Sequence, residues 1–220
     1  MNRTYGQLPV DLGHFPIKVE ETMSYLYMPI KMKDSAVLKV PNRLKVFYPL
    51  LARVFERLPY EQYFKNYFYI TAKHQLVNPQ AWGARGGWHA DGFLTNDLNW
   101  IWSDSSPTIF NTSEFDITPD HNISLGEFSA QAKHENNVTY SDYTLLELNP
   151  YVVHEVAPVT RYFMRTFVKI SMSPEKYNLK GNTHNYDFDY SWKMYDRDEV
   201  RNHPVYAELS NSDYVPADVA

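Results

Sequence analysis

The chain of 220 residues contains no cysteine. This absence excludes a disulfide framework, a thiolate metal site and a cysteine nucleophile. It fits a reducing compartment, so we expect a cytoplasmic protein. The chain also has no internal repeat and no glycine-rich phosphate loop, which argues against a solenoid and against a P-loop nucleotide site.

Long apolar runs and an excess of positive charge are missing as well. The first residues, Met1 to Gly6, have no apolar core of signal-peptide length, and no later run approaches a membrane span. We therefore expect no membrane partner. The net charge of −5 disfavours a broad electrostatic grip on nucleic acid. These absences favour a small-molecule partner.

What the chain does contain is short runs of aromatic and β-branched residues, which predict a mainly β fold with flanking helices. We interpret residues 1–220 as one domain, with a helix-containing region at about 1–66 and a distinct C-terminal segment at about 174–220. That segment has too many aromatic residues to be disordered. We expect it to pack on the domain or on a second subunit, which would give a homo-oligomer.

Several elements can be placed from the pattern. Apolar residues recur at helical intervals between Asn42 and Leu58, and Pro49 indicates that the regular helix starts near Tyr48. Strands are predicted at 67–72, 98–102, 151–156 and 162–170, and the run through Lys73, Gln75 and Val77 either continues the first of these or begins its partner strand. Trp100 and Trp102 share a strand face, where they form part of the core or a hydrophobic wall. Residues 1–40 indicate short strands and turns.

The most informative residues are His89, Asp91 and His154. A strand end at 89–91 would direct the first two side chains to the same side, and His154 would join them from a facing strand. Two imidazoles and one carboxylate on one face of a metal leave the opposite face open for small ligands. Taken singly, each histidine can be an ordinary hydrogen-bonded residue and Asp91-Gly92 a turn. Taken jointly, they favour a metal site.

This pattern resembles that of the Fe(II)/2-oxoglutarate-dependent dioxygenases, with a metal motif similar to those of phytanoyl-CoA hydroxylase and taurine dioxygenase. The family has His-x-Asp, a distal His and often an Arg eleven residues later, which is the interval from His154 to Arg165. The resemblance implies a double-stranded β-helix (jelly roll), Fe(II) held by His89, Asp91 and His154, and 2-oxoglutarate anchored by Arg165. It also implies that Thr108 shares the co-substrate carboxylate.

Other residues of the chain are candidates for the same roles. Arg161 is a rival to Arg165, and His74 with Arg85 has the same interval but precedes the His-x-Asp. His121 and His134 are alternative ligands in a polar stretch at 111–142, although solvated loop histidines are the simpler interpretation. His184 and Asp187 lie close in sequence, but their interval and loop-like setting argue against a metal role.

A turn at 157–160 predicts that the strands of His154 and Arg165 form a hairpin with both side chains on one face. The resemblance implies an oxygenase that couples decarboxylation of 2-oxoglutarate to oxidation of a substrate, which we expect to be an unidentified small molecule. The alternatives are a cupin-like metal enzyme that does not use 2-oxoglutarate, and a non-catalytic jelly-roll interaction protein.

Overall fold

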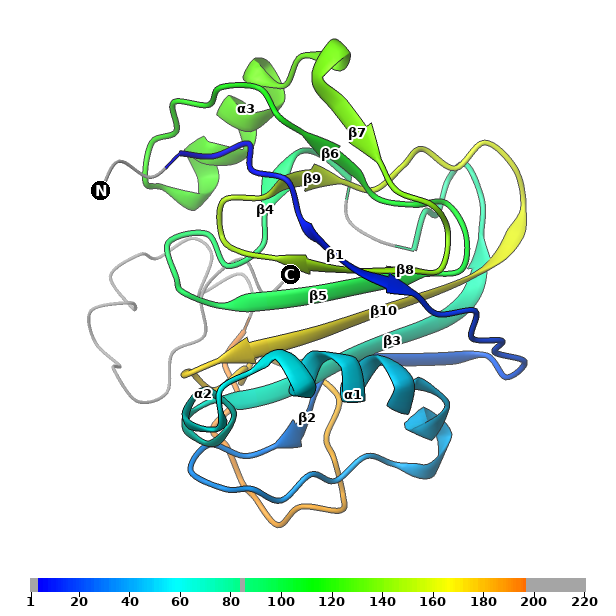
Figure 1. Cartoon of the computed structure of the whole chain (residues 1–220), viewed down its shortest axis with the longest axis vertical. Coiled ribbons are helices and arrows are strands. Elements are labelled where there is room, and N and C mark those ends of the chain that lie inside the picture. Colours follow the sequence, from blue (N-terminus) through cyan, green and yellow to red (C-terminus); the bar gives the residue numbers. More distant parts are fainter. Residues whose placement is uncertain (1–3, 84–85, 197–220) are drawn as a thin grey trace.

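Two antiparallel sheets form the molecule, and the computed structural model describes residues 4–83 and 86–196 (Figure 1). The larger sheet has six strands in the order β1-β8-β5-β10-β3-β2. They are β1 (Val10–His14), β2 (Met23–Lys31), β3 (Tyr67–Val77), β5 (Leu98–Ser103), β8 (Thr144–Leu148) and β10 (Phe163–Ser173). The smaller sheet has the order β4-β9-β6-β7, with β4 (His89–Ala90), β6 (Ile109–Asn111), β7 (Asn137–Thr139) and β9 (Val153–Glu155).

The strand pairing is that of one long hairpin rolled into two layers. Strand β3 pairs with β10, β4 with β9, β5 with β8, and β6 with β7. Each pair encloses the next in sequence, and successive pairs alternate between the larger and the smaller sheet. This nested pattern is a double-stranded β-helix, or jelly roll, with flanking helices. The fold class predicted from the sequence is therefore confirmed.

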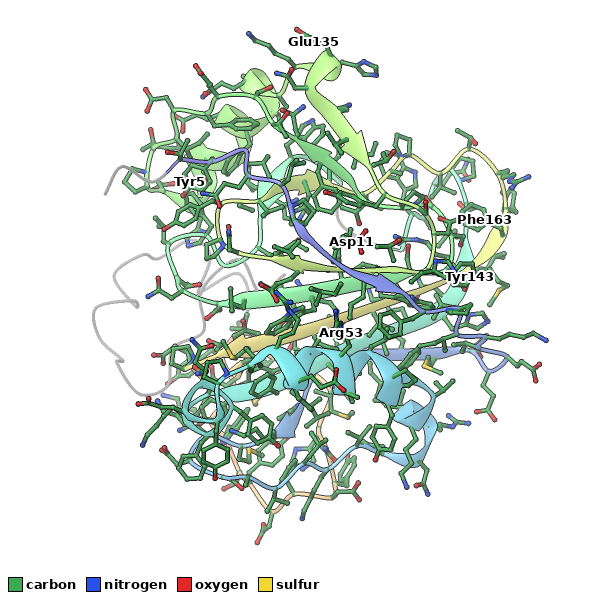
Figure 2. All side chains as sticks on the ribbon, in the orientation of Figure 1. Tyr5, Asp11, Arg53, Glu135, Tyr143 and Phe163 are labelled. Atoms are coloured by element: carbon green, nitrogen blue, oxygen red, sulfur yellow. The ribbon has the colours of Figure 1, made fainter. Side chains whose placement is uncertain are left out.

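The outer face of the larger sheet carries the main core. Helix α1 (Tyr48–Arg57) follows a 3-10 turn at Asn42–Phe47 and covers this face, with α2 (Tyr60–Lys65) after it (Figure 1). The predicted start near Tyr48 is confirmed, because Pro49 occupies the first helical turn. Leu50 from α1 packs in one cluster with Trp100 and Trp102, so both indoles belong to the core. Arg53, labelled in Figure 2, donates from α1 to the Leu12 carbonyl of β1.

The inner face of the same sheet is unusually polar. Successive residues of a strand point to opposite faces. Val168, Ile170 and Met172 of β10 therefore enter the core, while Arg165, Phe167 and Lys169 line a pocket on the other face. Thr71 and Lys73 of β3 line the same pocket, in register with Lys169 and Phe167. The fold thus directs three cationic side chains toward the smaller sheet.

Two sequence-based expectations were wrong. The predicted hairpin of the His154 and Arg165 strands does not form, because β9 pairs with β4 and β6 whereas β10 pairs with β3 and β5. In the polar stretch at 111–142, His121 and His134 were interpreted as loop histidines, but His121 begins α3 (His121–Gln131) and His134 begins a 3-10 turn at His134–Asn136. Strand β3 runs unbroken from Tyr67 to Val77, so residues 73–77 continue the strand predicted at 67–72.

The C-terminal segment packs on the domain as far as it is described. Tyr177 and Leu179 form a buried cluster with Tyr27 and Tyr69, and Trp192 packs against this cluster. Residues 197–220 of the expected segment lie outside the described residues, and the single-domain division stays a prediction. Among the described residues, no helix has the length and apolar character needed to cross a membrane.

Candidate metal centre

The smaller sheet brings together the three residues of the predicted ligand set. His89 of β4 and His154 of β9 are direct partners in the antiparallel pairing, and their ring centroids are 4.5 Å apart. Asp91 follows β4 directly, and Gly92 after it adopts a positive φ of 75° that turns the chain. One ligand atom from each of the three side chains lies within 4.8 Å of those of the other two. The sequence prediction thus correctly identified three residues that meet in space.

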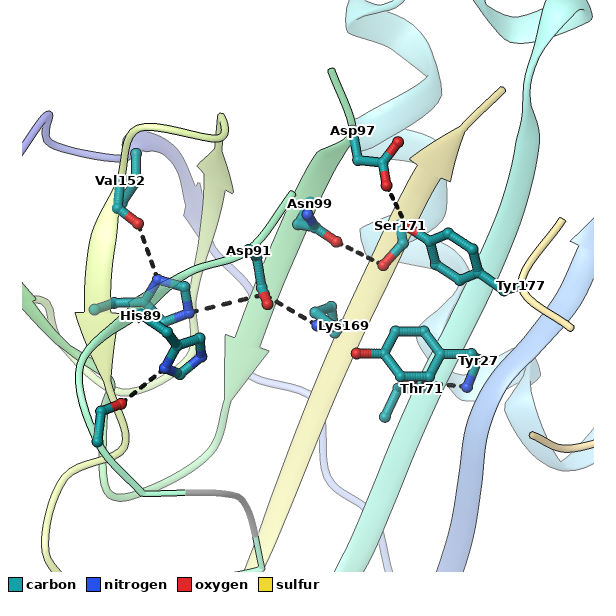
Figure 3. A network of polar contacts seen from close by, with 12 residues as sticks. Tyr27, Thr71, His89, Asp91, Asp97, Asn99, Val152, Lys169, Ser171 and Tyr177 are labelled. Atoms are coloured by element: carbon teal, nitrogen blue, oxygen red, sulfur yellow. Dashed lines mark hydrogen bonds and ion pairs between the residues drawn. The ribbon is translucent and has the colours of Figure 1, made fainter. Parts of the chain in front are cut away.

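The two imidazoles are oriented by backbone carbonyl groups. Nδ1 of His89 lies 2.8 Å from the Gly87 carbonyl oxygen, and Nδ1 of His154 lies 3.1 Å from that of Val152 (Figure 3). A carbonyl oxygen only accepts, so each Nδ1 carries the proton and donates it. Each Nε2 then keeps its lone pair. This arrangement, with the outer nitrogen fixed by a carbonyl, is the usual one for histidines that bind metals.

The electrostatics of the cluster favour an ionised carboxylate beside a neutral imidazole. Burial alone would raise the pKa of Asp91, but Lys169 and the two imidazoles lower it to about 2. Burial and the neighbouring His89 lower the pKa of His154 to about 4, against the opposing effect of Asp91. At neutral pH the group therefore offers one carboxylate and an unprotonated His154, which are the protonation states that a metal requires.

Lys169 is a neighbour of this cluster that the sequence analysis did not identify. Its Nζ donates to Oδ2 of Asp91 at 3.0 Å, and both side chains are buried. A signal was present in the sequence, because Lys169 lies four residues after Arg165 and so shares its strand face. A buried lysine in an apolar strand needs an anionic partner as much as a buried arginine does.

The same pocket, of about 130 Å³, contains the predicted co-substrate residues. Arg165 is buried on β10 and Thr108 lies near the start of β6; both line the pocket together with the three candidate ligands. Burial lowers the pKa of Arg165 to about 10, against the opposing charges of Asp104 and Asp142, so the guanidinium stays charged. Its Nε and Nη2 donate to the carbonyls of Ser105 and Ser106 at 3.1 and 3.0 Å.

Lys73 adds a second cation to this part of the pocket. Its Nζ donates to the Gly83 carbonyl at 2.9 Å, and it lies on β3 opposite Phe167. Burial, and then the charges of Lys169 and Arg165, lower the pKa of Lys73. Like charges this close in a partly buried pocket are stabilised by an anionic ligand. The sequence analysis placed Lys73 in a strand but gave it no role.

The competing residues do not join the cluster. Arg161 is exposed and precedes β10. His74 points to the opposite side of β3 from Lys73 and forms a hydrogen bond with Thr166. Arg85, which follows His74 by eleven residues, lies outside the described residues. His121 starts α3 beside Phe93, and the exposed His134 lies in a 3-10 turn. His184 is exposed and stacks on Tyr190 instead of meeting the candidate ligands, and Asp187 is exposed.

The donor set fits a divalent transition metal. Two imidazole nitrogens and one carboxylate suit iron, zinc, copper or nickel better than calcium or magnesium, which prefer oxygen donors. Three protein ligands also leave positions open, as catalytic sites require and closed structural sites do not. The residues present therefore fit the metal that the sequence pattern predicts.

Comparisons with known proteins give no family assignment. No protein-family model matches the chain, and no curated protein matches it. Among solved structures, EvdO2 from Micromonospora carbonacea var. aurantiaca is similar with 15% identity and a TM-score of 0.35, over 59% of this chain and 64% of that one. The same protein complexed with 2-oxoglutarate gives 16% identity and a TM-score of 0.36, over 61% and 66%. The matched part spans just under two thirds of those chains, and similarity at this level identifies no activity.

Proposed function

We propose that this protein is an Fe(II)- and 2-oxoglutarate-dependent dioxygenase that oxidises a small molecule. The observation that carries the proposal is the meeting of His89, Asp91 and His154 in one pocket with a buried, charged Arg165. A metal site alone fits many reactions. A metal site with a fixed cation in the same small pocket fits a reaction in which an anionic ligand binds beside the metal.

Each residue would have a separate role. His89, Asp91 and His154 would hold the metal, with both imidazoles fixed by their carbonyl bonds. Arg165 would bind the distal carboxylate of 2-oxoglutarate, with Lys73 and Thr108 beside it in the pocket. Fe(II), bound with that co-substrate, would supply the coupling of oxidative decarboxylation to oxidation of a C–H bond. The walls of the pocket would exclude bulk water and orient the ligands.

Charge and size favour a small co-substrate and substrate. Three cations line the pocket, and Asp91 is the acidic residue among its described lining residues. Such a pocket attracts a small dianion. The cavity is too small to admit a macromolecule, and the net charge of −5 gives no general attraction to nucleic acid.

One observation favours a second function. Two donors of Arg165 already bond the carbonyls of Ser105 and Ser106, which is also what a structural support of this loop would do. The protein would then be a cupin-like metal enzyme that does not use 2-oxoglutarate. The guanidinium has five N–H groups, so these two bonds leave donors for a carboxylate and the first function is retained.

The test is an anaerobic titration of the purified protein with Fe(II) and 2-oxoglutarate, followed by the visible metal-to-ligand charge-transfer band. We expect a band in the parent, none in His154→Ala, and at least about 10-fold weaker 2-oxoglutarate binding in Arg165→Met, since a charge-assisted pair is lost. Arg161→Met, which removes an exposed arginine near the start of the same strand, is the matched control and should behave as the parent.

The other outcomes of this titration would favour the alternative functions. Bound iron without a band, together with an Arg165→Met variant that behaves as the parent, would favour the cupin-like enzyme. No iron binding by the parent would overturn the enzyme proposal and favour an interaction role. A band accompanied by release of succinate would justify a screen of small-molecule substrates.

A further inference from the structure

The contact between Lys169 and Asp91 places a positive charge directly on a candidate metal ligand. Nζ of Lys169 lies 3.0 Å from Oδ2 of Asp91, and the same oxygen lies 3.7 Å from Nε2 of His154. Figure 3 shows the contact between Asp91 and Lys169 as a dashed line. Lys169 therefore engages the carboxylate oxygen that faces the metal-binding imidazole.

The position of Lys169 is fixed by a second set of contacts. Its Nζ lies 4.9 Å from the centre of the Tyr27 ring, a cation-π distance (Figure 3). Tyr27 lies where the pairing of β2 with β3 shifts register, and its φ of 44° is a left-handed value that is rare for a tyrosine. Its backbone N–H donates to Oγ1 of Thr71, the residue opposite Lys169 in the β3–β10 pairing. Strained backbone of this kind persists where the surrounding structure requires it.

The ammonium group of Lys169 bonds the Asp91 carboxylate at 3.0 Å, and both side chains are buried. Opposite charges in contact stabilise each other's charged forms. An oxygen that accepts a charged N–H bond has less electron density for a metal, and a metal must compete with the ammonium for that oxygen.

We propose that Lys169 is a positioning residue that keeps Asp91 a single-oxygen ligand. A free aspartate can bind a divalent metal through both oxygens, which strengthens metal binding but fills one more coordination position. Because Lys169 holds Oδ2 on the side of the imidazole, the carboxylate would present that one oxygen to a metal, and the position that its second oxygen would fill stays open. The affinity for the metal is then lower, but enough coordination positions stay open for a ligand that binds the metal through two of its own atoms. This inference rests on the proposed function.

The experiment measures two affinities that should move in opposite directions. Mn(II) is titrated by the loss of the free-ion electron paramagnetic resonance signal, and oxalate is then titrated calorimetrically into the Mn(II)-loaded protein. Oxalate binds a metal through two oxygens and lacks the distal carboxylate that would reach Arg165. In Lys169→Met we expect Mn(II) to bind about 10-fold tighter and oxalate about 10-fold weaker; the size is that of other changes next to metal ligands, but the effect on the metal has the opposite sign.

Two further variants separate positioning from a loss of structure. Lys169→Arg keeps a cationic donor and should restore oxalate affinity at least in part. Lys31→Met removes another buried lysine, whose ammonium bonds the Phe64 and Asn66 carbonyls outside the pocket, and should leave both affinities within about twofold of the parent. If Lys169→Met does not fold, Lys169→Gln, an uncharged donor, should show the same two shifts at smaller size.

The outcomes distinguish this inference from the proposed function. A parent that binds no Mn(II) overturns both. A parent that binds Mn(II) and oxalate, with both affinities unchanged or both weakened in Lys169→Met, overturns only the role of Lys169. Opposite shifts, restored by arginine, support it.

Discussion

Asp97 is a buried acid for which burial, not a counter-ion, determines the protonation state. It precedes β5, is only 1% exposed, and accepts the Tyr177 hydroxyl at Oδ2 over 2.7 Å. Burial raises the pKa of Asp97 to about 6, against the lowering effect of hydrogen bonds from Ser173, Tyr177 and Thr95. Asp91, equally buried, is instead ionised because Lys169 lies beside it. The two acids show that the nearest cation decides the charge of a buried carboxyl.

This difference predicts that Asp97→Asn stabilises the protein at high pH. Because the folded-state pKa lies above the unfolded value, the charged form is unfavourable in the folded protein, and its cost is absent below about pH 4 and complete above about pH 6. Asparagine is neutral throughout. We expect a gain of about 1–3 kcal/mol in the free energy of unfolding at pH 8 and about a third of that gain at pH 4.5, measured by urea denaturation.

The exposed Asp187→Asn is the control and should change neither value. An Asp97→Asn variant that is equally destabilised at both pH values would show that the Tyr177 hydrogen bond, and not the buried charge, dominates at this position.

Single residues were the most predictable part of the candidate site. His89, Asp91, His154 and Arg165 were selected because ligand types and order carry chemical meaning that does not depend on the exact fold. Lys73 and Tyr27 were not, since a lysine or tyrosine in a strand has no signature of its own, and the signal of Lys169 was only that it shares the strand face of Arg165. Their roles depend on strand register and on the bulge in β2, which a single sequence does not specify.

At the scale of elements, long periodic segments were predicted well and short ones were not. The helix from Tyr48 and strands β3 and β10 have enough residues for a pattern to repeat. Strand β9 has three residues, and the turn beside it suggested a hairpin that the nested pairing excludes. Helix α3 lacks an apolar stripe, yet Asp120 accepts a bond from the Ile123 N–H as a helix cap does. In the sequence, Asp120 directly after Pro119 is the feature that indicates the start of this helix.

The position of α1 predicts that it supports the sheet without taking part in the site. Leu50 is fully buried between α1 and the outer face of the larger sheet, opposite the pocket. We expect Leu50→Ala to lower the free energy of unfolding by about 2–5 kcal/mol, through lost contacts and a cavity, and to leave Mn(II) affinity within about twofold. Chemical denaturation and metal titration of the same preparation test this.

Val46→Ala, at an exposed position in the preceding 3-10 turn, is the control and should cost less than about 0.5 kcal/mol. A large loss of metal affinity in Leu50→Ala would mean that the packing of α1 is transmitted through the sheet to the pocket.

At the scale of the whole molecule, the candidate site depends on both sheets. The three metal-ligand candidates come from the smaller sheet and the β4–β5 connection, whereas Lys73, Arg165 and Lys169 come from the larger sheet. The bond from Lys169 to Asp91 joins the two. The smaller sheet has strands of only two or three residues, so its own backbone pairing gives it little stability. A metal that binds β4 and β9 together would strengthen this weaker layer.

Metal binding should therefore raise the melting temperature of the whole chain. At a free metal concentration of about 100 times Kd, a ligand that binds only the folded state adds about 2.7 kcal/mol, which corresponds to about 5–10 °C for a chain of this size. We expect this shift with Mn(II) or Fe(II) in the parent and in His134→Ala, which removes an exposed histidine, but not in His154→Ala. Mg(II) at the same concentration should have little effect, because it prefers oxygen ligands.

Hydrogen exchange should localise the added protection to β4 and β9. A shift that persists in His154→Ala would place the metal elsewhere in the molecule, and then neither the imidazole pair nor its carbonyl bonds would explain the stabilisation.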